Sequence, residues 1–277
     1  MTVTEDSGAS PDVLDLIERY YDAVPRREAR AEDHGPLTLF VREGEGWPFY
    51  ARPAFGWSGP VRAGDVLRVR DRQRELGIPE SFEWVAETTP ALRAAAEEAG
   101  LVVHEHPLMV LGTDAAPVAP AYPAVRVLEA DDPVLPSALV VPHLAFAEPG
   151  TRVGAAGTAD LAEAILARAG DGSLESGTAR VRAGLTVLAA AVEDGTALCA
   201  GQHNQVGEVS EIVGVGTLPA ARRRGLALAV TAALIADARS RGVKTVFLSA
   251  GDEDVARIYA RLGFRRAGTA LIAEPAG

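Results

Sequence analysis

The chain has 277 residues and a formal net charge of −11, and 48% of its residues are hydrophobic and 23% charged. A typical domain has about 150 residues, so this length favours two domains, and the ordinary apolar content argues against long disorder. The excess of acids argues against a nucleic-acid partner, and the single cysteine excludes a disulfide scaffold. With no apolar run near the roughly 20 residues of a membrane span and no signal-peptide pattern, we expect a cytoplasmic protein without a membrane partner.

The first 111 residues alternate helix and strand signals. Apolar residues at helical spacing predict a first helix over 12–23, and Gly77 and Gly100 are suitable ends for two later helices. Thr88 or Thr89 is the expected cap of the second of these. The remaining expected elements are strands over 37–41 and 49–52, a helix over 65–76, a strand over 81–86, a helix over 90–99 and a strand over 101–111.

Residues 112–124 (GTDAAPVAPAYPA) have few side chains able to pack, so we interpret them as a linker between domains at 1–111 and 125–277. In the second domain, Asp194-Gly195 is a strong hairpin turn, and Asp252 is the expected cap of the last helix. The alternation of elements predicts an α/β or α+β fold around a mixed sheet. These elements are a strand over 125–128, a helix over 160–169, hairpin strands over 185–193 and 196–202, a strand over 209–218, a helix over 226–241, a strand over 244–249 and a helix over 252–262.

The ends of the two domains share one ungapped register. Aligning Gly100 with Gly263, 163 positions later, places Trp84 on Phe247 and repeats the order helix, glycine, strand, cap, helix, glycine, strand. The ordered match favours duplication of one fold. The alternative is two unrelated α/β segments that share common helix punctuation.

The most informative stretch is 217–242, where a strand ends at Pro219, a short loop follows and a long helix starts at once. Such a turn presents unpaired backbone N–H groups at the positive end of a helix dipole, which is a site for phosphate. Gly225 lets the backbone approach an anion closely, and Ala227 leaves room beside it. The spacing is neither a P-loop nor GxGxxG. Positive charge is added by Arg222, Arg223 and Arg224.

Arg222-x-x-Gly225-x-Ala227 resembles the [QR]-x-x-G-x-[GA] loop of the GNAT superfamily of acyl-CoA N-acyltransferases. Downstream, residues 252–264 resemble the family's NxxAxxLYxKLGF segment. Asp252 and Val255 depart from it, standing where asparagine and alanine are usual. The two motifs occur in the right order on the expected elements, and the resemblance covers 124–277. The matching residues of the second motif are Tyr259, Leu262, Gly263 and Phe264.

The resemblance implies two GNAT-like domains, each a mixed, mostly antiparallel sheet flanked by helices, with acetyl-CoA bound by the second. In the family the loop amides hold the pyrophosphate, and the end of the preceding strand pairs with the pantetheine arm. Small Gly214 and Gly216 suit a bulge or a close approach there. The first domain has Ala96 in place of Tyr259 and lacks the loop, so we interpret 12–111 as a degenerate copy. The implied coenzyme contacts are Val215, Gly216, Thr217, Arg222, Arg223, Arg224, Gly225, Leu226, Ala227, Asp252 and Tyr259.

Two side chains are candidates for catalysis. The resemblance makes Tyr259 the general acid that protonates the leaving thiolate, and the alternative is a core tyrosine with a hydrogen-bonded hydroxyl. In some GNAT enzymes a glutamate placed like Glu211 takes the amine proton through water. The alternative is an outward-facing glutamate of an alternating strand. Glu208, on the same strand with the opposite parity, and His203 compete for the role of base.

Other polar residues carry weaker signals. We expect Cys199 to be a small core residue and not a nucleophile. Residues 142–157 either shape an acceptor pocket or form a plain loop. No metal site is expected, because the histidines lack a convincing ligand spacing: His34, His104, His106 and His143.

The expected function is transfer of an acetyl group from acetyl-CoA to an amine. Direct attack in a ternary complex is expected, because the sequence offers no credible covalent nucleophile. The expected acceptor is a small-molecule amine, and a homodimer is left open. The alternative is a catalytically silent acyl-CoA-binding sensor or structural partner.

Overall fold

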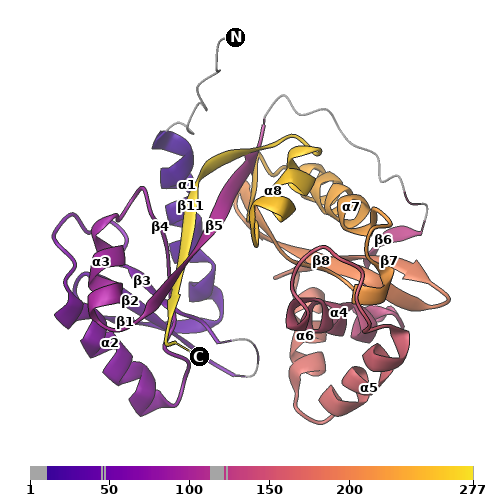
Figure 1. Cartoon of the computed structure of the whole chain (residues 1–277), viewed down its shortest axis with the longest axis horizontal. Helices are drawn as coiled ribbons and strands as arrows, with labels where there is room; N and C mark the ends of the chain where they lie inside the picture. The colour runs from indigo at the N-terminus through magenta and orange to yellow at the C-terminus, as the bar shows by residue number, and fades with distance from the viewer. Residues whose placement is uncertain (1–10, 45, 47, 113–121, 123, 277) are drawn as a thin grey trace. The chain divides into compact units, whose positions relative to one another are not determined.

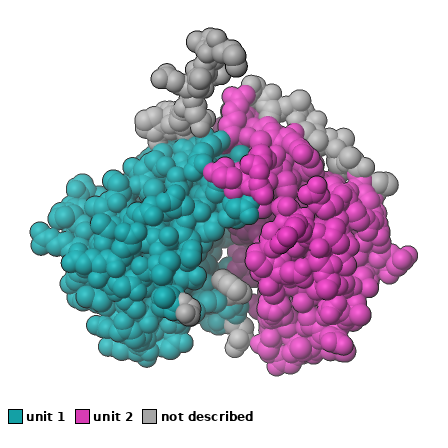
Figure 2. Space-filling model, in the orientation of Figure 1, with its two compact units in different colours: residues 1–109, 249–252, 266–277 teal, residues 110–248, 253–265 magenta. Residues whose placement is uncertain are grey.

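The computed structural model describes residues 11–44, 46, 48–112, 122 and 124–276 (Figure 1). The chain forms two compact units (Figure 2): residues 1–109, 249–252 and 266–277 make up unit 1, and residues 110–248 and 253–265 make up unit 2. Most of the expected linker, 113–121 and 123, lies outside the described residues, so the boundaries of the domains and of the linker stay a prediction. None of the helices in the described part of the chain is long and apolar enough to cross a membrane.

Unit 1 contains a mixed sheet with the strand order β1-β2-β3-β4-β11-β5. β3 and β4 run parallel, whereas β1–β2, β2–β3 and β4–β11 are antiparallel. The last two residues of β5 and the first two residues of β11 belong to unit 2. The strands are β1 (Ala29–Asp33), β2 (Leu37–Arg42), β3 (Ala51–Pro53), β4 (Phe82–Val85), β5 (Val102–Leu111) and β11 (Phe264–Glu274), and the helices are α1 (Pro11–Ala23), η1 (Pro25–Arg27), α2 (Ala63–Leu76) and α3 (Ala91–Glu98).

The main apolar cluster of unit 1 joins the sheet to α2 and α3. Phe82 and Trp84 of β4 share one face of the strand and pack with Val66 of α2 and Leu92 of α3. Ala96, which the sequence aligns with Tyr259, is fully buried in this cluster. The matched position in unit 1 is therefore a methyl group within a packed core.

The strands of unit 2 follow one another in the order β10-β9-β8-β7-β6 of an 11-stranded sheet. β9 and β10 run parallel, whereas β6–β7, β7–β8 and β8–β9 are antiparallel. The strands are β6 (Val125–Leu128), β7 (Val187–Glu193), β8 (Thr196–Val206), β9 (Val209–Thr217) and β10 (Thr245–Ser249), and the helices are α4 (Leu135–Ala147), α5 (Thr158–Arg168), α6 (Ser173–Arg182), η2 (Pro219–Ala221), α7 (Leu226–Ser240) and α8 (Glu253–Ala260).

Helices cover both faces of the sheet of unit 2. α4 and α7 each contact β8 and β9, and Figure 1 shows them on opposite sides of these strands. The approach of α4 requires a glycine, because a Cβ on Gly216 would lie 2.8 Å from the Cα of Pro142. β9 is thus enclosed by two helices, and the loop that leaves its end leads directly into α7.

The elements expected from the sequence are present, with ends shifted by a few residues. The turn at Asp194-Gly195 is confirmed, since both residues have positive φ, 47° and 75°. The expected threonine cap of α3 is wrong. Pro90 occupies the N-cap position, and the Thr88 hydroxyl donates to the Val85 carbonyl and to Glu18.

Besides the short 3-10 helices η1 and η2, three elements in the described part of the chain were not expected: β1, α4 and α6. β1 is a half-exposed strand with charged residues and no apolar alternation, and α6 has no buried residue to set a helical period. α4 is apolar on nearly all sides and contains Pro142, which usually argues against a helix interior. These three elements lack the one-sided apolar pattern by which a sequence predicts an element, because they are buried on nearly all sides or hardly at all. β11 is the strand after Gly263 that the repeat implied, and the structure gives its bounds.

The predicted repeat appears in the order of the elements. At the offset of 163 positions, α2, β4, α3 and β5 of the first half correspond to α7, β10, α8 and β11. The parallel pairs β3–β4 and β9–β10 also occupy matching places. This supports the duplication and allows the two copies of the strand-to-helix loop to be compared directly.

Candidate functional site

The loop between β9 and α7 has two residues in the left-handed conformation. After η2, Arg223 has φ 67° and Gly225 has φ 79°, and α7 begins at Leu226. Glycine adopts this conformation freely, whereas an arginine does so at a cost of roughly 1–2 kcal/mol. Backbone strain of this kind gathers at ligand sites. Leu226 is buried and Ala227 is half-buried, so no large side chain projects into the solvent from these first two residues of α7.

The N-terminus of α7 has no acidic side chain, whereas its counterpart in unit 1 has one. Gly225 offers no side-chain cap, and the first turn of α7 contains no acidic residue. At the matching place in α2, the Asp65 carboxylate accepts a hydrogen bond of 2.8 Å from the Arg62 amide. The first amides of a helix have no partner within the helix and attract an anion. The carboxylate of Asp65 puts a negative charge in the first turn of α2, which disfavours a second anion there, whereas the first turn of α7 has no such charge.

The three arginines of the loop have different environments. Arg222 is buried, and its guanidinium donates to the carbonyls of Ala145 and Arg152. Arg224 forms an ion pair with Glu193. Arg223 is exposed, and its side chain forms no ion pair within the described residues. Of the three, Arg223 therefore has the charge most available for a phosphate.

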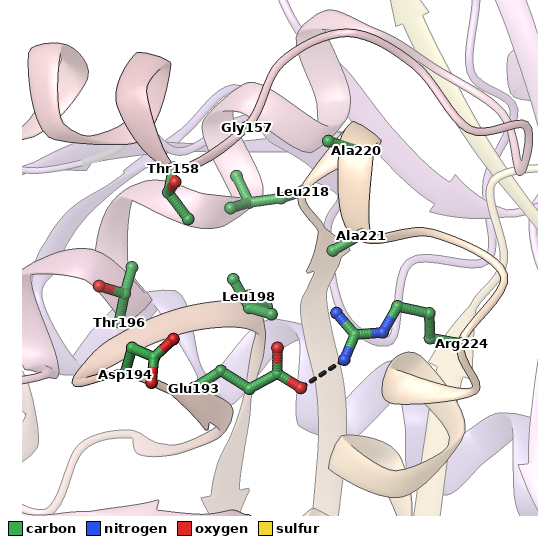
Figure 3. A pocket seen from close by; sticks show the side chains of 10 residues that line it. All are labelled: Gly157, Thr158, Glu193, Asp194, Thr196, Leu198, Leu218, Ala220, Ala221 and Arg224. Carbon is green, nitrogen blue, oxygen red and sulfur yellow. Dashed lines mark hydrogen bonds and ion pairs between the residues drawn. The ribbon is translucent and has the colours of Figure 1, made fainter.

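A pocket of about 430 Å³ adjoins the loop (Figure 3). Leu198 and Leu218 contribute apolar surface, and Thr158 at the start of α5 lies beside Leu218. The ion pair between Glu193 and Arg224 spans one side, as the dashed line in Figure 3 shows. The hairpin β7–β8 thereby neutralises one loop arginine.

β9 carries the predicted bulge and close approach. Its register with β8 shifts between Ala200 and Gln202, and Gly214, which lies at this shift, has φ 64°. Gly216 packs against α4, as described above. The bulge separates Glu211, near the start of β9, from Val215 and Thr217 at its end.

β9 and β10 pair over a short distance only. Their register covers Val209–Glu211 against Thr245–Phe247, and in the described chain residues 212–217 pair with β8 alone. A strand with a partner on one side exposes backbone donors and acceptors on the other. An extended ligand can pair with such an edge as an added strand.

Tyr259 lies near Cys199, whose register partner on β9 is Thr217. Tyr259 is 7% exposed and packs edge-on against Phe264, with ring centroids 6.0 Å apart. Burial raises its pKa well above the ordinary value, and the nearby Cys199 raises it further. Within the described part of the chain its hydroxyl has no hydrogen-bond partner. A buried tyrosine usually has such a partner, so this hydroxyl is suited to meet a ligand.

Cys199 is fully buried opposite Thr217 in the register of β8 and β9. Burial raises the pKa of its thiol to about 12, although a hydrogen bond with Thr217 acts in the opposite direction. A thiol with this pKa is a poor nucleophile at neutral pH. This supports the expectation of a core residue.

The candidates for the general base have different surroundings. Glu211 is half-buried on β9, at the last position of the register with β10. Glu208 precedes β9 and does not lie on the strand as expected, because its backbone belongs to the turn and its carboxylate pairs with Lys244 at 2.8 Å. His203 is fully buried, and its Nδ1 and Nε2 are each 2.9 Å from an oxygen, of Ser210 and Asp237 respectively. Glu211 has the position best suited to a base near the open edge of β9.

The environment of His203 predicts a dependence of stability on pH. Burial lowers its pKa, although Asp237 acts in the opposite direction. Below the ordinary histidine pKa of about 6.5, the unfolded chain takes up a proton that the folded chain resists, so stability falls as the pH falls below that value. We expect His203→Gln to flatten the decline of the thermal midpoint between pH 7.5 and 5.5. The exposed His104→Gln variant is the control, and an equal decline in both variants would contradict the assignment.

The remaining expected residues are scattered. Asp252 is exposed, precedes α8 directly and belongs to unit 1. The first six residues of 142–157 belong to α4, and the rest connect α4 to α5. No group of three or more metal-ligating side chains occurs among the described residues. Sequence reasoning missed Glu193 and Thr158, because contacts between a hairpin, a helix start and a distant loop leave no local pattern.

Comparisons with known proteins agree with this architecture. Residues 189–272 match the family described as FR47-like protein. A GCN5-related N-acetyltransferase from Kribbella flavida is 23% identical with a TM-score of 0.65, and the match covers 96% of each chain. One from Sphaerobacter thermophilus is 16% identical with a TM-score of 0.53, covering 94% of this chain and 84% of that one. A GCN5-related N-acetyltransferase-like protein from Streptococcus suis is 12% identical with a TM-score of 0.54, covering 95% and 98%. Among curated proteins none matches the chain.

These similarities extend over nearly the whole chain and define its class. The protein is an α+β protein with mixed, mostly antiparallel pairing. It has the GNAT acetyltransferase fold, with an FR47-like segment in the second half, as the two sequence motifs predicted.

Proposed function

We propose that unit 2 binds acetyl-CoA and transfers its acetyl group to the amine of a small molecule. The observation that carries the proposal is the first turn of α7, which contains no acidic side chain, in contrast to the first turn of α2, which contains Asp65. Its amides would hold the pyrophosphate, with Arg223 as the nearest available charge. The edge of β9 beyond Glu211 would pair with the pantetheine arm and bring the thioester toward Tyr259.

The reaction needs three proton transfers. Glu211 would take a proton from the acceptor ammonium through water, and the neutral amine would then attack the thioester carbon in the ternary complex. A C–N bond forms, and the Tyr259 hydroxyl would protonate the departing sulfur as the C–S bond breaks. The nitrogen would then lose its second proton, which restores the hydroxyl of Tyr259 and leaves the neutral amide. The raised pKa of Tyr259 keeps the hydroxyl protonated, as a general acid requires.

Calorimetry with acetyl-CoA tests the binding half of the proposal. We expect saturation at one molecule per chain, because the negative charge of Asp65 in the first turn of α2 disfavours an anion at the corresponding site in unit 1. A stoichiometry of two would contradict the assignment of a single site. Absence of binding would overturn the proposed function.

Release of free thiol in the presence of a panel of amines tests the chemical half. We expect release that depends on both acetyl-CoA and an amine. Binding without release with any amine of the panel would instead favour a catalytically silent acyl-CoA sensor. A stable acetyl-protein intermediate would contradict direct attack.

A further inference from the structure

The side chain of Arg222 is directed into the protein. It is 9% exposed, and its guanidinium lies 2.9 Å from the carbonyl oxygen of Ala145 and 3.1 Å from that of Arg152. A third hydrogen bond joins it to the carbonyl of Glu148. All three carbonyls belong to the end of α4 or to the segment that follows it. The planar fork of an arginine can serve several oxygens at once.

Backbone hydrogen bonds reinforce this connection. The amide of Gly154 donates to the carbonyl of Pro219, and the amide of Ala220 donates to the carbonyl of Ala156, both at 3.0 Å. Residues 148–157 and the loop at 219–222 are thus joined at both backbone and side-chain level. Arg222 also brings its positive charge to the negative C-terminal end of the α4 dipole.

We propose that Arg222 is a positioning residue that couples the order of residues 148–157 to occupancy of the coenzyme site. It acts through the loop and makes no contact with phosphate. A ligand that immobilises residues 223–227 also immobilises residues 219–222. Through the hydrogen bonds of Arg222, this loss of motion extends to residues 148–157, which follow α4. The proposal rests on coenzyme binding at the loop, the proposed function, but the junction itself is present without a ligand.

Hydrogen–deuterium exchange with coenzyme A as the probe tests the coupling. In the unmodified protein, saturating coenzyme A should slow exchange both in 219–228 and at the Gly154 amide. In Arg222→Ala, Gly154 should exchange about tenfold faster without ligand, since several charge-assisted hydrogen bonds are lost. Coenzyme A should still slow exchange in 219–228 but no longer at Gly154. Arg222→Lys should restore part of the response.

Arg152→Ala is the matched control. It removes an exposed arginine from the same segment and keeps the carbonyl that Arg222 binds, so the response of Gly154 should persist. A response of Gly154 in Arg222→Ala equal to that of the unmodified protein would overturn the proposal. So would protection of 219–228 with an unchanged Gly154 in the unmodified protein. If coenzyme A protects neither region, the proposed function fails, while the ligand-free exchange rates still test the junction. Arg222→Gln, which keeps some donors, replaces the alanine variant if the latter does not fold.

Discussion

Gly225→Val is expected to weaken acetyl-CoA binding by about a hundredfold or more. The affinity should fall because the new side chain would stand where the pyrophosphate approaches the first amides of α7. Loss of two charge-assisted hydrogen bonds corresponds to about 3 kcal/mol or more, hence a hundredfold in the dissociation constant. No atom lies within 4 Å of a Cβ built on Gly225, so the Cβ of a larger residue meets no clash there. The remaining cost is backbone strain at φ 79°. Calorimetry beside a thermal melt measures both effects.

The same helix supplies a matched control at its other end. Gly242 has φ 82° and also has no neighbour within 4 Å of a built Cβ. Gly242→Val should therefore lower the thermal midpoint by a similar amount and leave the affinity for acetyl-CoA unchanged. If both variants lose affinity equally, the effect comes from strain in α7 and the phosphate site lies elsewhere.

Local signals were sufficient to predict the loop and most of the elements. Gly225 adopts the left-handed conformation directly before α7, Gly214 lies at a bulge, and Gly216 allows the close approach of α4. Each of these positions favours glycine for a conformational reason, and such glycines can be recognised in the sequence. The repeat could also be predicted, because the corresponding helices of the two halves end at glycines in matching positions, Gly100 and Gly263.

The environments of the loop arginines could not be predicted. Three consecutive arginines suggest one positive cluster, yet Arg222 bonds to carbonyls 70 and 77 positions away and Arg224 pairs with Glu193. These partners are set by the packing of α4 and of the β7–β8 hairpin against the loop. Charge counting along a sequence cannot reveal which charges are already paired in the fold. Asp65 in the first turn of α2 is the reverse case, because an acidic residue at the third position of a helix is a local signal that the sequence contains.

Tyr259→Phe is expected to lower turnover by tenfold or more, with little effect on folding or on acetyl-CoA affinity. The phenylalanine keeps the ring and its contact with Phe264. Since the hydroxyl has no hydrogen-bond partner within the described residues, its loss leaves no buried group unsatisfied. General acid catalysis contributes typically 10²–10⁴-fold, and a thiolate leaves readily enough to place the effect near the lower end.

The pH dependence distinguishes an acid from a packing residue. Because burial holds the pKa of Tyr259 above its ordinary value of about 10, the hydroxyl stays protonated from pH 7 to 10. The ratio of turnover between the unmodified protein and Tyr259→Phe should therefore stay constant over this range, while both rates rise as the acceptor amine loses its proton. Turnover is measured with an amine identified by the thiol-release panel, beside the thermal midpoint and the acetyl-CoA dissociation constant. Tyr20→Phe, which alters a buried tyrosine of unit 1, should leave turnover unchanged. Near-normal turnover in Tyr259→Phe together with a lower thermal midpoint would show that Tyr259 serves packing, and the leaving sulfur would then depart without a proton from this residue.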